Sequence, residues 1–209
     1  MSNMAELMDE LEVCDRCTAM VKSRSELRGE GAPPIFPNGN EHAAVVIVGI
    51  APGHSKVDAK YERERQIKRR ESFGYREGAG GLLDKCLISV GLTRADVWIT
   101  NICHCNVRSP RLISDRDAET CVVNFLSKEL ALVNPRKIIV LGMDAKLRFT
   151  KHLKEWEKRA RVYYLTHPAF FLHAPFADVN AYVERWIAIF ESDDTARIED
   201  FAAAKEKEQ

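Results

Sequence analysis

Four short apolar runs recur along this chain, and they constrain its fold more than any other feature. The runs are rich in β-branched and aromatic residues and span residues 43–50, 96–102, 137–141 and 161–166. Continuous runs of this kind are typical of strands buried on both faces of a parallel sheet. Helical patterns alternate with them, at residues 80–90, 114–133, 143–156 and 177–190. This order predicts an α/β fold in which helices flank a central, mostly parallel four-stranded sheet.

The two ends of the chain differ from this core. Residues 4–22 are predicted to form an amphipathic helix with Leu7, Leu11 and Met20 as buried positions. The cysteine pair Cys14 and Cys17 would close this helix. Residues 191–209 are highly charged and receive no role. We therefore expect one domain over residues 1–190, in a chain that acts as a monomer.

Composition and charge limit the expected location of the protein and its binding partners. The 209 residues contain no run of about 18 apolar residues, the length that a membrane-spanning helix needs. The N-terminus is too acidic and polar for a secretory signal, so we expect a cytoplasmic protein with no membrane partner. Lys plus Arg and Asp plus Glu are equal at 31 each, so any nucleic-acid-binding face must be local. The basic run at residues 60–76 is either such a face or a solvated helix.

The cysteine spacing points to a metal. Cys14 and Cys17 form a C-x2-C pair, and Cys105 and Cys121 follow far downstream. Cytosolic thiols are kept reduced, so this spacing indicates metal binding more than disulfides. Four thiolates suit either zinc or an iron-sulfur cluster, and the spacing does not decide between them.

Two further cysteines complicate the ligand set. Cys103 would point to the same side of an extended segment as Cys105 and could compete with it as a ligand. Cys86 lies among leucines in a helical pattern and is better explained as a small buried hydrophobic residue. Packing of all six cysteines is the alternative to a metal site.

Several segments, in order, resemble those of the iron-sulfur uracil-DNA glycosylases known as family 4, with some likeness to family 5. The likeness covers roughly residues 10–175 and rests on Cys14 and Cys17, GIAPG at 49–53, AGGLLD at 79–84, ITNICHC at 99–105, Cys121, IIVLG at 138–142 and THPAFFL at 166–172. It implies the three-layer fold of that superfamily and a 4Fe-4S cluster on Cys14, Cys17, Cys105 and Cys121. It also implies a monofunctional DNA glycosylase, which hydrolyses the bond between base and deoxyribose and leaves an abasic site.

The resemblance also assigns roles at the site. Asn101, at the end of a predicted strand, matches the asparagine that reads the base, since an amide can donate and accept at once. His167 would donate a hydrogen bond to the departing base. Phe73 or Tyr75 would stack on the flipped base. Leu172, with Phe171 near it, matches the wedge that enters the duplex; core packing of the phenylalanines is the alternative.

The GIAPG turn would bring the backbone close to the base and to a phosphate. Its residues are Gly49, Ile50, Ala51, Pro52 and Gly53. A glycine-rich turn after a first strand also occurs in enzymes that bind free nucleotides, so that function stays an alternative.

The first motif departs from family 4, which has a glutamate where this chain has Ile50. Family 5 carries an apolar residue there. We expect Glu77 to replace the carboxylate, with Asp58 and His54 as alternatives, and the basic insertion at 60–70 to alter the pocket rim. The expected substrate is uracil or a modified pyrimidine in DNA. The alternatives are a hypermodified base, such as hydroxymethylated or glucosylated cytosine in foreign DNA, and an inactive iron-sulfur relative that only binds DNA.

Overall fold

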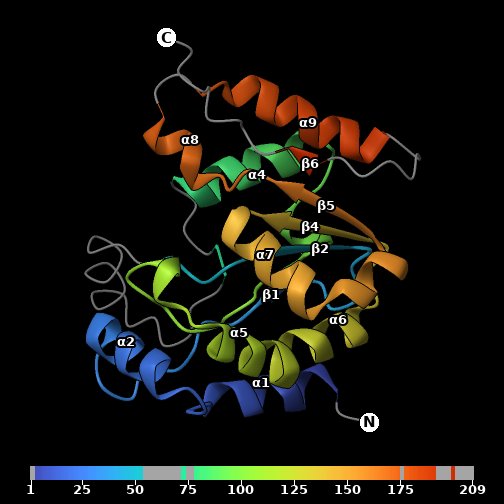
Figure 1. Cartoon of the computed structure of the whole chain (residues 1–209). Helices are drawn as coiled ribbons and strands as arrows, with labels where there is room; N and C mark the ends of the chain where they lie inside the picture. The colour runs from blue at the N-terminus through green and yellow to red at the C-terminus, as the bar shows by residue number, and fades with distance from the viewer. Residues whose placement is uncertain (1–2, 54–71, 74–77, 175–176, 192–198, 201–209) are drawn as a thin grey trace.

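A computed structural model describes residues 3–53, 72–73, 78–174, 177–191 and 199–200. Its centre is a six-stranded sheet in the order β1-β3-β2-β4-β5-β6 (Figure 1). The four inner strands are parallel and are β3 (Trp98–Asn101), β2 (Val45–Gly49), β4 (Lys137–Leu141) and β5 (Arg161–Leu165). They confirm the four predicted strands and the α/β class.

Two short edge strands were not predicted. β1 (Asn38–Gly39) pairs antiparallel with β3, and β6 (Glu199–Asp200) pairs parallel with β5. A strand of two residues is too short to show an alternating pattern, so the sequence gives no signal for it. β6 lies within the charged tail, and the other residues after Glu191 lie outside the described part of the chain.

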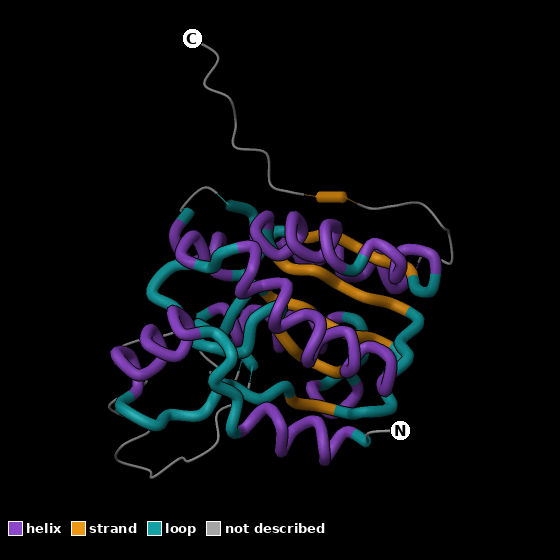
Figure 2. Tube along the Cα trace, turned by 60° about the horizontal axis from the view of Figure 1, so that its bottom comes forward, coloured by secondary structure: helices purple, strands orange, loops and turns teal. Residues whose placement is uncertain are grey.

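Alternating side chains of the inner strands enter two separate cores. Val46 and Val48 face one core and Val45 and Ile47 the other, as the two-residue period of a strand requires. One core is covered by α4 (Ala79–Ser89) and α9 (Val179–Glu191). The other is covered by α1 (Met4–Glu12), α5 (Asp115–Cys121), α6 (Ser127–Val133) and α7 (Met143–His152). The three layers are visible in Figures 1 and 2.

The predicted helix at residues 4–22 is wrong, because the structure has two helices there. Asn3 caps α1 in a capping box with Glu6, and α2 spans Thr18–Arg28. Cys17 is the extended N-cap of α2, so the cysteine pair lies in the break between the helices. Leu7, Leu11 and Met20 are buried as predicted. The break frees both thiols from a helix face.

The predicted helix at residues 114–133 is continuous but irregular. Ser114 is its N-cap and accepts a hydrogen bond from the Asp117 backbone N–H (3.1 Å). A π-helical turn at Val122–Leu126 joins α5 to α6, and it begins directly after Cys121. Such turns insert one extra residue and occur often at functional sites.

Shorter helices connect the remaining elements. 3-10 turns lie at Arg94–Asp96, Pro110–Leu112 and Lys154–Lys158, and α8 spans Ala169–His173. None of the helices in the described ranges is long and apolar enough to cross a membrane.

Candidate active site and metal centre

Asn101 ends β3 at the carboxyl edge of the sheet, where ligands of parallel sheets bind. It lies in register with Gly49, the last residue of β2. Its side chain is 1% exposed, and Nδ2 donates a hydrogen bond to Ser72 Oγ (2.8 Å). Oδ1 has no hydrogen-bond partner among the described residues. A buried carbonyl oxygen without a partner costs free energy unless a ligand satisfies it.

Gly49 makes room for this amide. A Cβ on Gly49 would lie 2.5 Å from Asn101 Oδ1 and 3.1 Å from the Phe73 ring. The absence of a side chain at Gly49 therefore leaves room for both the Asn101 amide and the Phe73 ring at the end of β2. In the same turn, Asn106 Nδ2 donates to the carbonyl oxygen of Gly53 (2.9 Å).

Gly49→Ala is expected to lower the rate of the reaction at this site by about 10²-fold, because displacing a reacting or binding group by about 1 Å costs that much. The measurement is the single-turnover rate on the substrate proposed below. Ile88→Ala is the control, because Ile88 is 70% exposed on α4. Equal rates for the two variants would contradict this role of Gly49.

Ile50 points away from this site. Its side chain is 7% exposed and packs in the core cluster of Val48 and Ile102. Its carbonyl oxygen accepts a hydrogen bond from the Cys103 N–H (3.0 Å). Ile50 thus contributes backbone and packing, and no acid or base.

The Phe73 ring stacks on His167, with 5.5 Å between ring centroids and an interplanar angle of 28°. The backbone of Phe73 has φ +52°, which a non-glycine residue adopts only where contacts hold it. Arg94 supplies such a contact, because its Nη1 donates to the Phe73 carbonyl oxygen (2.6 Å). Its other nitrogens donate to Asp84 Oδ1 (2.5 Å) and to the Gly80 carbonyl oxygen (3.2 Å). Arg94 thereby links the backbone of Phe73 to α4.

Arg94→Met is expected to weaken substrate binding by roughly 10-fold, the factor for losing a charged hydrogen bond that positions a binding group. Single-turnover rates at several enzyme concentrations separate this effect on half-saturation from the maximal rate, which should change little. Arg159→Met is the control, because Arg159 lies before β5, at the opposite end of the strands. A fall only in the maximal rate would refute the positioning role.

His167 follows β5, at the same sheet edge. Its Nδ1 accepts a hydrogen bond from the Ala169 N–H (3.1 Å), so in the neutral ring the hydrogen is on Nε2. Burial lowers the pKa of His167 to about 4. The ring is therefore neutral near pH 7 and offers one donor, the Nε2–H.

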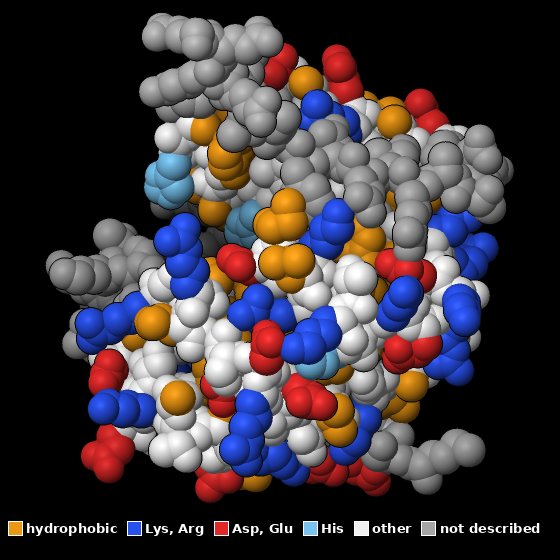
Figure 3. Space-filling model, viewed as in Figure 1, with side chains coloured by type: hydrophobic (Ala, Val, Ile, Leu, Met, Phe, Trp, Pro, Cys, Tyr) orange, Lys and Arg blue, Asp and Glu red, His pale blue; other side chains and the backbone are white. Residues whose placement is uncertain are grey.

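α8 presents apolar side chains beside the site. Leu172 is 49% exposed and Phe170 is 40% exposed, whereas the Phe171 ring packs against Tyr182 with 4.4 Å between centroids. Phe171 thus occupies the position that core packing predicts, and Leu172 stays the candidate wedge. Hydrophobic side chains reach the surface over α7 and α8 in Figure 3. Tyr75, Glu77, Asp58, His54 and the basic insertion 60–70 lie outside the described residues.

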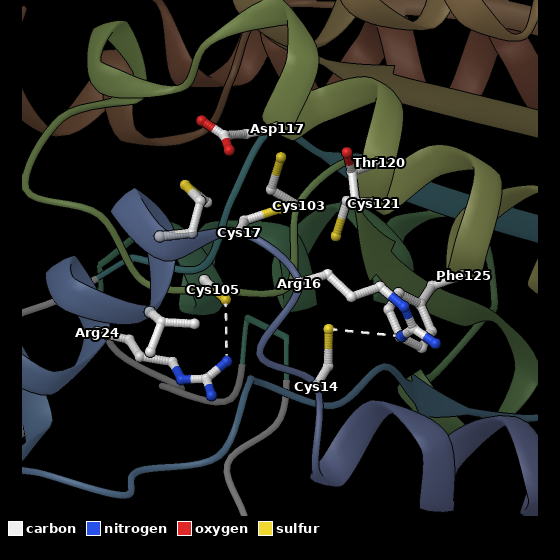
Figure 4. A pocket seen from close by; sticks show the side chains of 12 residues that line it. Cys14, Arg16, Cys17, Arg24, Cys103, Cys105, Asp117, Thr120, Cys121 and Phe125 are labelled. Carbon is white, nitrogen blue, oxygen red and sulfur yellow. Dashed lines mark hydrogen bonds between the residues drawn. The ribbon is translucent and has the colours of Figure 1, made fainter.

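Five cysteines line a second site, a small cavity that is partly open to solvent. They come from three segments: the α1–α2 break, the stretch after β3, and the end of α5 (Figure 4). They are Cys14, Cys17, Cys103, Cys105 and Cys121. The four ligands named in the sequence are thus brought together, and Cys103 joins them. Cys86 is fully buried in the core under α4, away from this cavity.

Two arginines donate hydrogen bonds to cavity thiols. Arg24 is buried and donates from Nη1 to Cys105 Sγ (3.3 Å), and Arg16 donates to Cys14 Sγ (3.7 Å). These guanidinium groups would offset the negative charge of a thiolate-bound metal. Sequence reasoning missed both, because nothing in the spacing of an isolated arginine shows which thiol it meets.

Three of these thiols, on Cys17, Cys105 and Cys121, hold their protons near pH 7 in the absence of a metal. Burial raises the pKa of Cys17 to about 12 and that of Cys105 to about 11. A hydrogen bond with Cys103, together with burial, raises the pKa of Cys121 well above its ordinary value. A metal would have to displace these protons, as thiolate ligation requires.

A buried ion pair supports the Cys103–Cys105 segment. His104 Nε2 lies 2.9 Å from Glu129 Oε1, and Trp98 Nε1 donates to Glu129 Oε2 (3.0 Å). Burial lowers the pKa of His104, but the adjacent Glu129 carboxylate outweighs burial and raises it to about 9. His104 Nδ1 also lies 3.1 Å from the carbonyl oxygen of Ile35. This network, unpredicted from the sequence, fixes the cysteines to α6.

Comparison with known proteins identifies the family of this chain. A family model described as the uracil DNA glycosylase superfamily matches residues 36–191. A type-4 uracil-DNA glycosylase of Archaeoglobus fulgidus is 28% identical over 192 residues, which cover 84% of this chain and 86% of the relative. One of Pyrobaculum aerophilum is 29% identical over 141 residues, which cover 68% of this chain and 61% of the relative. Because the family match spans most of the chain, from β1 to the end of α9, the chain belongs to the uracil DNA glycosylase superfamily.

Proposed function

We propose that this protein is a monofunctional DNA glycosylase that flips uracil out of DNA, hydrolyses its N-glycosidic bond and leaves an abasic site. One observation carries the proposal: the buried Asn101 amide, whose oxygen has no hydrogen-bond partner among the described residues, and the Phe73 ring both border Gly49, and the Phe73 ring stacks on His167. The names of the relatives, type-4 uracil-DNA glycosylases, support uracil as the base.

Asn101 provides the groups that read a pyrimidine edge. Uracil offers an N3–H donor and an O4 acceptor, and an amide side chain can pair with both. Oδ1 is free to accept, and Nδ2 has a second hydrogen besides the one that it donates to Ser72. Phe73, held by Arg94, supplies an aromatic face for the extruded base.

His167 provides the donor for base departure. As the glycosidic bond breaks, negative charge develops on uracil O2, and the neutral Nε2–H can donate to that oxygen. A neutral donor holds its proton throughout, so no proton transfer to the base is needed. Leu172, exposed on α8, would fill the space that the flipped base leaves in the duplex.

The group that activates water is proposed to be Glu77, because Ile50 supplies no carboxylate. Glu77→Gln should lower the maximal rate and leave uracil binding unchanged. If Glu77→Gln keeps full activity and Asp58→Asn or His54→Ala lowers the maximal rate, the residue whose variant is slow would be the group that activates water.

The cysteine cavity is proposed to hold a 4Fe-4S cluster on Cys14, Cys17, Cys105 and Cys121. Among the described residues, no three Cys, His, Asp or Glu side chains are arranged to bind a single metal ion. A zinc site would need its sulfurs roughly 3.8 Å apart, since each Zn–S bond is about 2.3 Å. A cluster is larger and binds each cysteine through a different iron, which suits thiols spread around a shared cavity. When bound, it would tie the α1–α2 break to α5 and to the segment after β3.

The test is a panel of duplex oligonucleotides that each contain one target base: uracil, 5-hydroxymethyluracil, 5-hydroxymethylcytosine, its glucosylated form or hypoxanthine. Alkali cleaves the strand wherever the protein has left an abasic site. We expect cleavage at uracil. Cleavage confined to a hypermodified cytosine would favour that substrate, and tight binding without cleavage at any base would show an inactive DNA-binding relative.

A further inference from the structure

Ser72 lies at the base-reading amide, although the sequence motifs do not single it out. It is fully buried, and its backbone is held on both sides by the segment that leads into β1. Its N–H donates to the carbonyl oxygen of Phe36 (2.8 Å), and its own carbonyl oxygen accepts from Asn38 Nδ2 (2.5 Å). The hydroxyl of Ser72 is therefore fixed in position beside Asn101.

The hydrogen-bond directions at this hydroxyl follow from its single hydrogen. Ser72 Oγ donates that hydrogen to the Phe36 carbonyl oxygen (3.1 Å). Its lone pairs then face Asn101 and accept from Nδ2 (2.8 Å). If the Asn101 amide were flipped, the hydroxyl would have to leave Phe36 to avoid two buried acceptors facing each other. Ser72 thus favours the orientation in which Asn101 Oδ1 remains free.

The orientation of the amide decides which pyrimidine it can read. Uracil and its 5-substituted forms have a hydrogen on N3, which the free Oδ1 can accept. Cytosine has a lone pair on N3 and an amino group on C4, so it needs the opposite arrangement of donor and acceptor. A freely rotating amide would serve both bases.

We propose that Ser72 is a specificity-determining positioning residue, which locks the Asn101 amide so that the site selects pyrimidines that carry an N3–H over cytosine. This inference rests on the proposed glycosylase function and deepens it. It also ranks the modified substrates, because a 5-substituted uracil fits the locked amide and a hydroxymethylated or glucosylated cytosine does not.

The experiment measures equilibrium binding to duplexes in which the target nucleotide is 2′-fluoro-deoxyuridine or 2′-fluoro-deoxycytidine, which resist hydrolysis. Wild type should prefer uracil, and Ser72→Ala should reduce the uracil-to-cytosine affinity ratio by about 10-fold, the factor for one neutral hydrogen bond. Ser72→Thr retains the hydroxyl and should restore the ratio. Ser89→Ala, which removes a hydroxyl bonded to the Cys86 carbonyl at the end of α4, should leave it unchanged.

Excision of uracil by the wild type is measured in parallel, so failure of the proposed function is seen separately from failure of this inference. An unchanged ratio in folded Ser72→Ala would overturn the role of Ser72 even if uracil is excised. If Ser72→Ala does not fold, Ser72→Cys takes its place, because sulfur is similar in shape and a much weaker acceptor. An unchanged ratio in that variant would overturn the inference equally.

Discussion

Asn101→Ala is expected to lower the single-turnover rate of uracil excision by on the order of 10³-fold, at the upper end of what removal of one key hydrogen-bonding group costs. The variant loses the acceptor for N3–H and the donor for O4 together. It also leaves Ser72 Oγ without the Asn101 donor. The rate should therefore fall far more than for Gly49→Ala, which displaces the amide without deleting it.

The control for this prediction is Asn180→Ala, because Asn180 is exposed on α9. Thermal unfolding of both variants shows whether the fold is retained. Excision by folded Asn101→Ala within a factor of ten of the wild-type rate would show that another group reads the base.

Cys121→Ala is expected to abolish the broad visible absorbance of an iron-sulfur cluster and to lower the melting temperature by roughly 10 °C or more, since each kcal/mol corresponds to about 2–4 °C in a domain of this size. The thiol of Cys121 lines the same cavity as the other proposed ligands (Figure 4). Its loss would leave three thiolates and an incomplete coordination shell, and metal binding that requires the folded state contributes directly to folding.

Cys86→Ala is the control, because it makes the same change at a buried cysteine of α4 that lies in the other core, away from the cavity. It should keep the absorbance. A colourless wild-type protein that contains one zinc ion would contradict the cluster assignment.

Visible absorbance also decides whether Cys103 or Cys105 is the third cysteine ligand of the proposed cluster. Cys103 and Cys105 both line the cavity, but Arg24 contacts only the Cys105 sulfur among the interactions seen there. We expect Cys103→Ala to keep the visible absorbance and Cys105→Ala to lose it. The reverse result would make Cys103 the ligand.

Much of the fold could be predicted because its inner strands are continuous apolar runs. Each of the four is buried on both faces, so the sequence pattern and the structure report the same fact. The break between α1 and α2 could not be predicted, because residues 4–22 keep a helical pattern across it. At the break the backbone of Cys17 is extended, and Met20, in the first turn of α2, is buried. Tertiary packing of this kind overrides local helix propensity.

The site divides in a similar way. Asn101 ends β3, His167 follows β5, and both belong to short motifs, so the sequence could point to both. Ser72, Arg94 and Arg24 act through contacts with residues far away in the chain, and no local pattern distinguishes them from ordinary polar residues. Buried polar networks of this kind are defined by tertiary structure.

The structure shows the surroundings of Ile50, which stands where family 4 has a glutamate. Its side chain packs among apolar residues, so a carboxylate at this position would be buried unless it turned toward the site. The apolar residue is therefore compatible with a stable core. In the proposed glycosylase, the group that activates water would therefore be another residue.

Release of free uracil from DNA is the direct product of the proposed hydrolysis of the N-glycosidic bond. Wild-type protein is incubated with a duplex that contains one uracil, and free uracil and abasic sites are quantified separately by mass spectrometry and alkaline cleavage. We expect free uracil and abasic sites to accumulate in equal amounts, and Asn101→Ala to produce neither at a comparable rate. Folded wild-type protein that binds this DNA and releases no uracil would contradict the proposed function.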